Sequence, residues 1–308
     1  MKYFSMFSGI GGFEIGIEKA IKKSKCVGFS EIDKHAIQIY QKHFPGHTPY
    51  GDAKRIVPES IPNFDLLCGG FPCQAFSIAG RRGGFEDTRG TLFYEIARIA
   101  RIKRPKLLFL ENVKGLLSHD HGRTFGTILA TFSDLGYFLE WQILNSADFG
   151  VPQNRERVFI VGHLGNRSGR KVFPVTKDNG KINELQGQPI ANCLKARYEA
   201  NGDGSYVIES KLDAQKAVRA PLRFLDRNQK KFEGDYSFTV DSSNTSGIKV
   251  NQRIRRLTPT ECERLQAFPD GWTAGISDSQ RYKCLGNAVT VNVIEAIARR
   301  LYNLQTIN

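Results

Sequence analysis

The first 165 residues alternate between strand-like and helix-like segments, and this alternation constrains the fold more than any other feature of the chain. Short apolar runs such as KYFSMF, CVGFSEID, FDLLCGG and KLLFLENV are each followed by a longer segment with helical apolar spacing. Parallel strands need such crossover helices, and the helices then pack on both faces of the sheet. We therefore predict an α/β fold with a Rossmann-like, mostly parallel sheet and helices on both faces.

The alternation stops near residue 165. Residues 176–256 are polar and rich in Gly, Asn, Asp and Ser, with short β-like pieces such as GSYVIES and YSFTVDSS. The last helical segment, NVIEAIARRLYNL, has apolar spacing that suits packing back on the sheet. We predict a larger domain of residues 1–175 and 283–308, and a smaller, irregular, β-containing domain with its hinge over residues 176–282.

The charge balance favours a polyanionic partner. The chain has 44 Lys and Arg against 31 Asp and Glu, a net charge of +13, and nucleic acid is the first candidate. The alternative is a basic surface that only aids solubility. No apolar run is long enough to span a membrane, and the N-terminus lacks the features of a signal peptide, so we expect a cytoplasmic protein. The six cysteines and six histidines show no metal-binding spacing, so we expect reduced thiols and no metal.

The polar residues at the ends of the predicted strands are the candidates for ligand binding, because ligands of open parallel sheets sit outside the carboxyl ends of the strands. The first of these ends, FSGIGG, has Glu14 where a dinucleotide-binding pattern would need glycine, and a phosphate-binding loop is also absent. A carboxylate near a helix start would repel a pyrophosphate. This favours a ligand that carries a nucleoside and no phosphate. Glu31, 19 residues after Gly12, could hold its ribose diol or be a solvated turn carboxylate.

The segment GGFPCQAFS poses a choice between a buried, inert thiol and a nucleophile at Cys73. Arg81 and Arg82 follow closely in GRRGGF and can favour the thiolate. Glu111 ends the next apolar strand and can reach the same rim, and Arg155 and Arg157 alternate on an extended segment. One nucleophile, one carboxyl and two guanidiniums suit an electron-poor ring that becomes anionic, although ordinary surface ion pairs would give the same residue types.

Six motifs in this order resemble those of the DNA cytosine-5 methyltransferases, especially the compact bacterial enzymes of restriction-modification systems. They are FSGIGG, GFPCQAFS, ENV, QNRERV, RRLTPTECERLQAFPD and GNAVTVNV, and they cover nearly the whole chain. The resemblance implies S-adenosylmethionine as the cofactor and double-stranded DNA as the partner. It also implies that residues 1–175 and 283–308 form the catalytic domain, and that the region between QNRERV and RRLTP is the target-recognition domain.

The resemblance also implies roles for individual residues. Cys73 would attack C6 of cytosine, Glu111 would act at N3, Arg157 at O2, and Arg155 would steady the thiolate and Glu111. The implied cofactor-binding residues are Phe7, Gly9, Gly11, Gly12, Glu31, Ile32, Asp52, Pro72, Leu92, Asn287, Ala288 and Val289. The implied DNA-binding residues are Gln74, Ser77, Arg81, Arg82, Arg197 and Asn244. Ile32 departs from the family, because some members have an aromatic residue there; Phe7 could stack on the adenine instead.

The predicted function is therefore that of a protective DNA methylase, acting as a monomer, with any cognate restriction endonuclease separate from it. Residues 77–90 would close over a flipped base, and residues 193–204 and 240–247 would read base edges. An RNA cytosine-5 methyltransferase and a non-catalytic DNA-binding protein remain as alternatives. A dinucleotide-dependent oxidoreductase is disfavoured by the failed glycine pattern.

Overall fold

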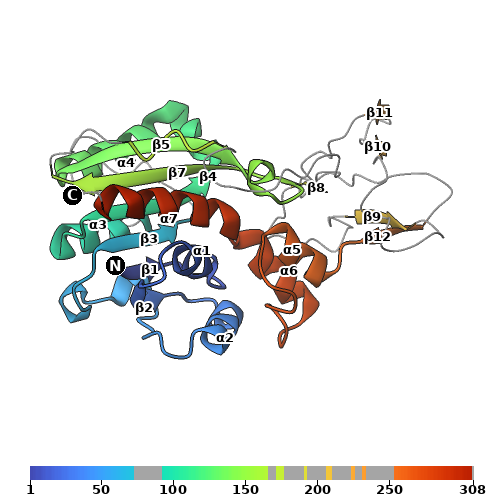
Figure 1. Cartoon of the computed structure of the whole chain (residues 1–308), viewed down its shortest axis with the longest axis horizontal. Coiled ribbons are helices and arrows are strands. Elements are labelled where there is room, and N and C mark those ends of the chain that lie inside the picture. Colours follow the sequence, from blue (N-terminus) through green and yellow to red (C-terminus); the bar gives the residue numbers. More distant parts are fainter. Residues whose placement is uncertain are drawn as a thin grey trace. The chain divides into compact units, whose positions relative to one another are not determined.

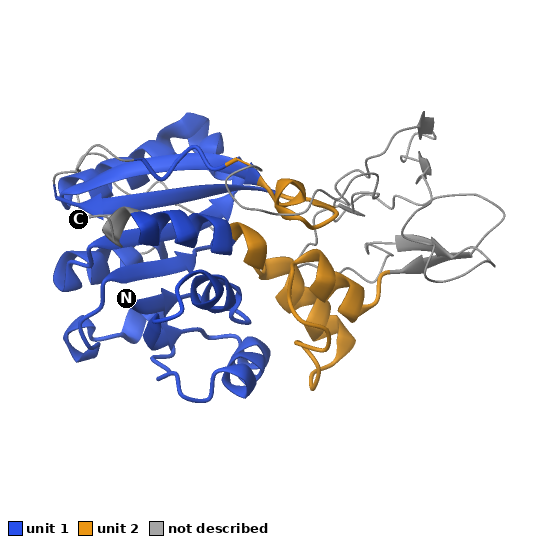
Figure 2. Cartoon of the chain, viewed as in Figure 1, with its two compact units in different colours: residues 1–144, 156–175, 294–308 blue, residues 145–155, 176–293 orange. Residues whose placement is uncertain are grey.

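The computed structural model in Figure 1 describes most of the first 176 residues, short pieces of the following polar region and the C-terminal helices. The described residues are 1–72, 92–165, 171–176, 191–192, 206–209, 223–225, 231–233 and 253–306. The chain divides into two compact units (Figure 2): unit 1 is Met1–Leu144, Glu156–Val175 and Ile294–Asn308, and unit 2 is Asn145–Arg155 and Thr176–Val293. Residues 145–155 and 283–293 thus group with unit 2, outside the bounds of the predicted smaller domain. The function of each domain stays a prediction.

A six-stranded sheet forms the centre of unit 1, with strand order β2-β1-β3-β4-β7-β5. Its strands are β1 (Lys2–Met6), β2 (Lys25–Ser30), β3 (Leu66–Gly70), β4 (Leu107–Val113), β5 (Tyr137–Asn145) and β7 (Glu156–Leu164). β1 pairs in parallel with β2 and β3, β3 pairs in parallel with β4, and β4 pairs antiparallel with β7. The prediction of a mostly parallel α/β sheet is confirmed.

Helices cover both faces of this sheet. They are α1 (Gly12–Ala20), α2 (Lys34–His43), α3 (Leu92–Lys103), α4 (Arg123–Asp134) and α7 (Val291–Thr306). On β4, the Phe109 ring packs against Phe13 of α1, with ring centroids 5.1 Å apart, whereas Leu108 and Leu110 belong to the buried cluster that contains α3 and α4. Because successive strand residues point to opposite faces, α1 lies on one face and α3 and α4 lie on the other.

The last helix packs against α1, at Gly16. A Cβ at this glycine would lie 2.6 Å from Ile294 of α7, so only glycine allows the close approach. Short 3₁₀ helices complete the connections: η1 (Ala53–Arg55), η2 (Pro58–Ser60), η4 (Lys114–Leu117), η5 (His119–Gly122) and, in unit 2, η6 (Ser146–Phe149). Among the described residues, no helix combines the length and apolar character needed to cross a bilayer.

Within the described residues, unit 2 contains short strand pairs and two α-helices besides η6. β6 (Gln153–Asn154) pairs with β8 (Ala191–Asn192), β9 (Tyr206–Glu209) with β12 (Arg253–Arg256), and β10 (Arg223–Leu225) with β11 (Lys231–Glu233). The helices are α5 (Pro259–Leu265) and α6 (Asp278–Asn287). GSYVIES contains β9, and YSFTVDSS lies outside the described residues.

A buried carboxylate links the two helices of unit 2. Glu263 on α5 is fully buried, and it accepts hydrogen bonds from Thr273 N at 2.8 Å and from an Arg281 guanidinium nitrogen on α6 at 3.1 Å. A buried carboxylate is tolerated when its charge is paired and its oxygens are hydrogen-bonded, as they are here. This contact fixes α6, and therefore the segment that follows α6.

Candidate functional site

The loop that joins β1 to α1 has three residues in the left-handed region of backbone space. Phe7 and Gly9 have φ values of 55°, and Gly11 has a φ of 91°. A Cβ at Gly11 would lie 2.4 Å from the ring of Phe44, so this glycine is required for contact with the end of α2. At Gly9, in contrast, a Cβ would meet nothing within 4 Å. The backbone therefore passes beside open space at Gly9, where a ligand can approach it closely.

Glu31 connects this loop to the end of β2. One carboxylate oxygen accepts from Gly9 N at 2.8 Å, and the other accepts from Ile32 N at 2.8 Å and from Asp33 N at 2.9 Å. A carboxylate offers about four acceptor sites, so three backbone donors leave room for a hydroxyl. The structure thus brings together two predicted cofactor residues, Gly9 and Glu31. Ile32, beside them, is 71% exposed.

Asp52 lies beside the end of β2. Ser30, the last residue of β2, donates from its hydroxyl to Gly51 O at 2.7 Å. Asp52 follows at once, and its carboxylate accepts from Lys54 N at 3.0 Å and begins the short helix η1. Its side chain is 39% exposed and can still accept a bond from a ligand. Two more predicted cofactor residues of unit 1, Pro72 and Leu92, are exposed and half-buried respectively.

A second group of polar residues lies at the end of β4. Glu111 is 7% exposed, and one of its carboxylate oxygens lies 3.0 Å from Nε of Arg157 on β7. The antiparallel pairing of β4 with β7 sets this contact, since Val113 and Arg157 are register partners. Charge-assisted bonds of this kind are about twice as strong as neutral ones. The predicted carboxyl and one predicted guanidinium are therefore together.

Asn112 fixes the chain that leads into the Pro-Cys-Gln segment. Its side chain is buried, and its amide nitrogen donates to Phe71 O at 2.8 Å. Its amide oxygen accepts from Val113 N at 2.8 Å. Gly70 on β3 is the register partner of Glu111 on β4. Pro72 comes two residues after Gly70. Asn112 belongs to the ENV motif, and its bond to Phe71 was not anticipated from the sequence.

Arg155 belongs to unit 2 and holds the segment after α6. Arg155 is 2% exposed. Its guanidinium donates to Ala288 O at 2.6 Å and to Gly286 O at 3.2 Å. Asn287, between these carbonyls, is exposed, while Ala288 and Val289 are buried. Arg155 thus supports three predicted cofactor residues, in addition to any contact expected at the thiolate. This anchoring was not visible in the sequence, because it joins residues more than 130 positions apart.

Glu14 differs most from its predicted environment. Instead of facing a ligand from the helix start, it is fully buried and accepts from the Tyr40 hydroxyl at 2.9 Å. Burial raises the pKa of Glu14 to about 7, so repulsion by a full negative charge was too strong an argument. The signal was present in the sequence: Glu14 falls with Ile10, Ile17 and Ile21 on one helical stripe.

Several predicted site residues lie outside the described residues. They are Cys73, Gln74, Ser77, Arg81, Arg82, Arg197 and Asn244, and with them the segments 77–90, 193–204 and 240–247. Within the described part of the chain, no cluster of His, Cys, Asp and Glu is placed to hold a metal ion.

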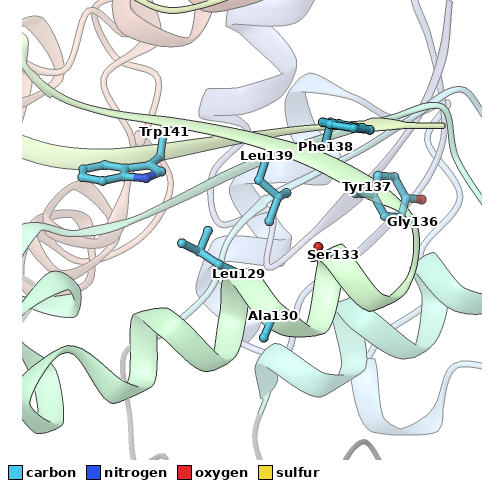
Figure 3. A pocket seen from close by; sticks show the side chains of 8 residues that line it. All are labelled: Leu129, Ala130, Ser133, Gly136, Tyr137, Phe138, Leu139 and Trp141. Carbon is cyan, nitrogen blue, oxygen red and sulfur yellow. The ribbon is translucent and has the colours of Figure 1, made fainter. Parts of the chain in front are cut away.

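A pocket of about 490 Å³ lies between α4 and β5 and contains none of the predicted site residues (Figure 3). Its lining is mainly apolar: Leu129, Ala130, Ser133, Gly136, Tyr137, Phe138, Leu139 and Trp141. The described candidate residues of unit 1 lie at its strand ends, those of unit 2 lie at the end of α6, and neither group lines this pocket.

Comparison with known proteins gives a consistent result. Residues 1–303 match the family model described as C-5 cytosine-specific DNA methylase. The Type II methyltransferase M1.ScrFI of Lactococcus lactis subsp. cremoris is 42% identical, over 97% of this chain and 77% of that protein. M.HpaII of Haemophilus parainfluenzae is also 42% identical, over 97% of this chain and 88% of its own. The crystal structure of S. pombe Dnmt2 methyltransferase shares the fold, with a TM-score of 0.70, 17% identity and full coverage of both chains.

Proposed function

The chain belongs to the C-5 cytosine-specific DNA methylase family, and we propose that it transfers the methyl group of S-adenosylmethionine to C5 of a cytosine within a specific short sequence of duplex DNA. Membership of this family implies a methyl donor and a DNA substrate. We propose in addition that the donor is S-adenosylmethionine and that the residues named below carry out the reaction. The observation that carries it is the contact of Glu111 with Arg157, beside the strand that continues into Pro72, Cys73 and Gln74.

The nucleophile in this proposal is Cys73. Cytosine is a poor nucleophile at C5, and attack of a thiolate at C6 converts the ring into an enamine whose C5 can accept a methyl group. The four described cysteines are all buried. Burial raises the pKa of Cys26 to about 12 and that of Cys68 well above its ordinary value, so neither supplies a thiolate near neutral pH. Cys73 follows Gly70, the partner of Glu111, by three residues.

Glu111 and Arg157 deal with the charge that the attack produces. As the C6–S bond forms, electron density moves onto N3 and O2. A protonated Glu111 would donate its proton to N3, and the Arg157 guanidinium would bind O2. Bound S-adenosylmethionine would supply the methyl group to C5 and would leave as a neutral thioether. A base, such as water, removes the C5 proton, N3 returns its proton, and the C6–S bond breaks to restore the thiolate.

Cofactor binding in unit 1 is assigned to the residues at its strand ends. Glu31 would accept from the ribose hydroxyls, Asp52 would accept from the adenine amino group, and Ile32 or Phe7 would pack on the ring. Support comes from the open space beside Gly9 and the unused acceptor capacity of Glu31. Gly11, Gly12, Pro72 and Leu92 would enclose the rest. Asn287, Ala288 and Val289 of unit 2 are assigned to the cofactor from their motif, GNAVTVNV. S-adenosylmethionine carries no phosphate, in keeping with the absent phosphate-binding patterns.

DNA recognition is assigned to segments outside the described residues. C6 is shielded in a stacked duplex, so the target base must be flipped out. Residues 77–90, with Gln74, Ser77, Arg81 and Arg82, would close over it, and residues 193–204 and 240–247, with Arg197 and Asn244, would read base edges. We further propose a monomer in the cytoplasm that protects DNA against a separate restriction endonuclease, since the similar proteins are named Type II methyltransferases.

Bisulfite sequencing of plasmid DNA from cells that express the chain tests this function. The expected result is protected cytosines in one short sequence context, and none with Cys73→Ser. Parallel methyl transfer assays on duplex DNA and duplex RNA separate the RNA alternative. Plasmid DNA without protected cytosines, or transfer to RNA alone, would overturn the proposal.

A further inference from the structure

Glu14 is a buried carboxyl directly behind the proposed cofactor loop, and the reaction above does not use it. It lies in the first turn of α1, three residues after Gly11, and is fully buried. One of its oxygens accepts from the Tyr40 hydroxyl at 2.9 Å. Ser5 of β1 lies beside the carboxyl, yet neither the second oxygen of Glu14 nor Ser5 Oγ makes a hydrogen bond of good geometry. The Ser5 hydroxyl can donate to this oxygen or accept a proton from it, so the other groups around the carboxyl decide which form is favoured.

The groups that face Glu14 offer no positive charge to balance a carboxylate. From the packed elements these groups are Tyr3 and Ser5 of β1, Cys26 of β2, Cys68 of β3, Tyr40 of α2 and Glu18 of α1. His47 reaches the cluster through the Tyr40 hydroxyl, 3.0 Å from its Nδ1, but burial lowers its pKa. A charged Glu14 would therefore be buried without a cationic partner among the described residues, which is costly. The neutral form suits this site.

The Glu14–Tyr40 bond connects the segments that form the proposed cofactor site. Tyr40 stacks on Phe29 of β2, with ring centroids 4.0 Å apart, and β2 leads directly into Glu31. One turn after Tyr40, the Phe44 ring occupies the space that a Cβ at Gly11 would need. The hydroxyl of Tyr40 thus joins the first turn of α1 to α2 and to the end of β2.

We propose that Glu14 is a positioning residue for S-adenosylmethionine binding, and that it acts as a protonated carboxyl that accepts from Tyr40. This inference rests on the proposed function of the loop. Ionisation places an unbalanced charge behind Gly11 and Gly12, and the loop then loses its arrangement. Cofactor affinity then falls as the pH rises through the neutral range, where the raised pKa of Glu14 lies.

Calorimetric titration of S-adenosylmethionine into the full chain at pH 6.0, 7.0 and 8.5 tests the inference. We expect the affinity of the unaltered protein to fall about tenfold over this range, which corresponds to about one pKa unit of coupling. Glu14→Gln keeps an acceptor for Tyr40 and carries no charge at any pH, so its affinity should be tight and independent of pH. Tyr40→Phe should weaken binding at all three pH values.

The matched control is Glu18→Gln. Glu18 is one turn further along α1 and also accepts from a tyrosine, Tyr3 at 2.9 Å, but it is 40% exposed and lies 3.9 Å from Nε2 of His47. This variant should keep the pH dependence of the unaltered protein.

Three results would overturn the inference. They are a pH-independent affinity in the unaltered protein, an unchanged pH dependence in Glu14→Gln, and a pH dependence that Glu18→Gln abolishes instead. Failure of the unaltered protein to bind S-adenosylmethionine at any pH would instead contradict the proposed function on which the inference rests. The pH dependence of the unaltered protein is itself a test, and it needs no variant to fold.

Discussion

Unit 1 holds two buried glutamates in different electrostatic surroundings. Glu111, at the end of β4, lies 3.0 Å from the guanidinium of Arg157. Glu14, on α1, has the hydroxyl of Tyr40 and no cation among the described groups that face it. Burial raises the pKa of Glu14 to about 7. The comparison shows that burial alone does not assign a function to a carboxyl. The cationic partner of Glu111 suits a site where charge develops during a reaction. The neutral partner of Glu14 suits a structural role.

The largest effect is expected from Glu111→Gln. It keeps the size of the side chain but removes the acid, so turnover should fall about 10²- to 10⁴-fold, the usual contribution of a positioned proton donor. Transfer of a radiolabelled methyl group to cognate duplex DNA measures this effect. Cofactor affinity should remain unchanged, because Glu111 is not assigned to the cofactor.

Glu156→Gln is the control for this prediction. Glu156 precedes Arg157 on β7 and pairs with Lys114 at 2.9 Å, but both side chains are about half exposed. Such surface pairs contribute little, and turnover should stay within about twofold. Equal turnover in Glu111→Gln and Glu156→Gln would remove the distinction between the two buried carboxyls.

The second effect concerns stability. Arg157→Ala leaves Glu111 buried without its partner, and breaking a buried pair costs about 3 kcal/mol of unfolding free energy. Arg299→Ala breaks an exposed pair with Glu295 on α7 and should cost at most about 0.5 kcal/mol. Chemical denaturation at pH 7 compares the two variants. Similar losses of unfolding free energy in both variants would show that the Glu111–Arg157 pair stabilises the protein no more than an exposed pair does.

The last effect is the pH dependence of stability at Glu14. Its folded pKa, about 7, is above its ordinary value of 4.5, so the folded state binds the proton more tightly than the unfolded chain does. The associated stability is complete below pH 4.5 and is lost as the pH rises to about 7, a change of about 3 kcal/mol. Relative to the unaltered protein, Glu14→Gln should gain most of this amount between pH 5 and pH 8. A constant difference across this range would place the pKa of Glu14 near its ordinary value.

The sequence predicts the sheet well, because the alternation of short apolar runs with helical segments is a local pattern that can be recognised from neighbouring residues alone. Gly9 and Glu31 follow two neighbouring parallel strands, β1 and β2, and the bond between them shows that they lie at the same edge of the sheet. The hydrogen bonds that Asn112 and Arg155 donate to distant backbone carbonyls could not be predicted from the sequence. Both join side chains to backbone carbonyls far along the chain, at Phe71 and at Gly286 and Ala288, and register and packing decide which carbonyl is near.

Glu14 was misjudged for a different reason. A charged residue in the first turn of a helix is usually solvent-exposed, and that expectation outweighed its place on the apolar stripe. Tyr40, which donates to Glu14, comes from α2 and stacks on Phe29 of β2, so the environment of Glu14 depends on tertiary packing.

Trapping on a DNA duplex with 5-fluorocytosine at the target position tests the central claim most directly, since the fluorine at C5 cannot leave as a proton does. With S-adenosylmethionine present, we predict a protein–DNA adduct that survives denaturation and maps by peptide mass spectrometry to Cys73. Cys73→Ser should give none. The account would be contradicted by a protein that methylates the ordinary duplex but forms no adduct with the fluorinated one, or by an adduct on any other cysteine.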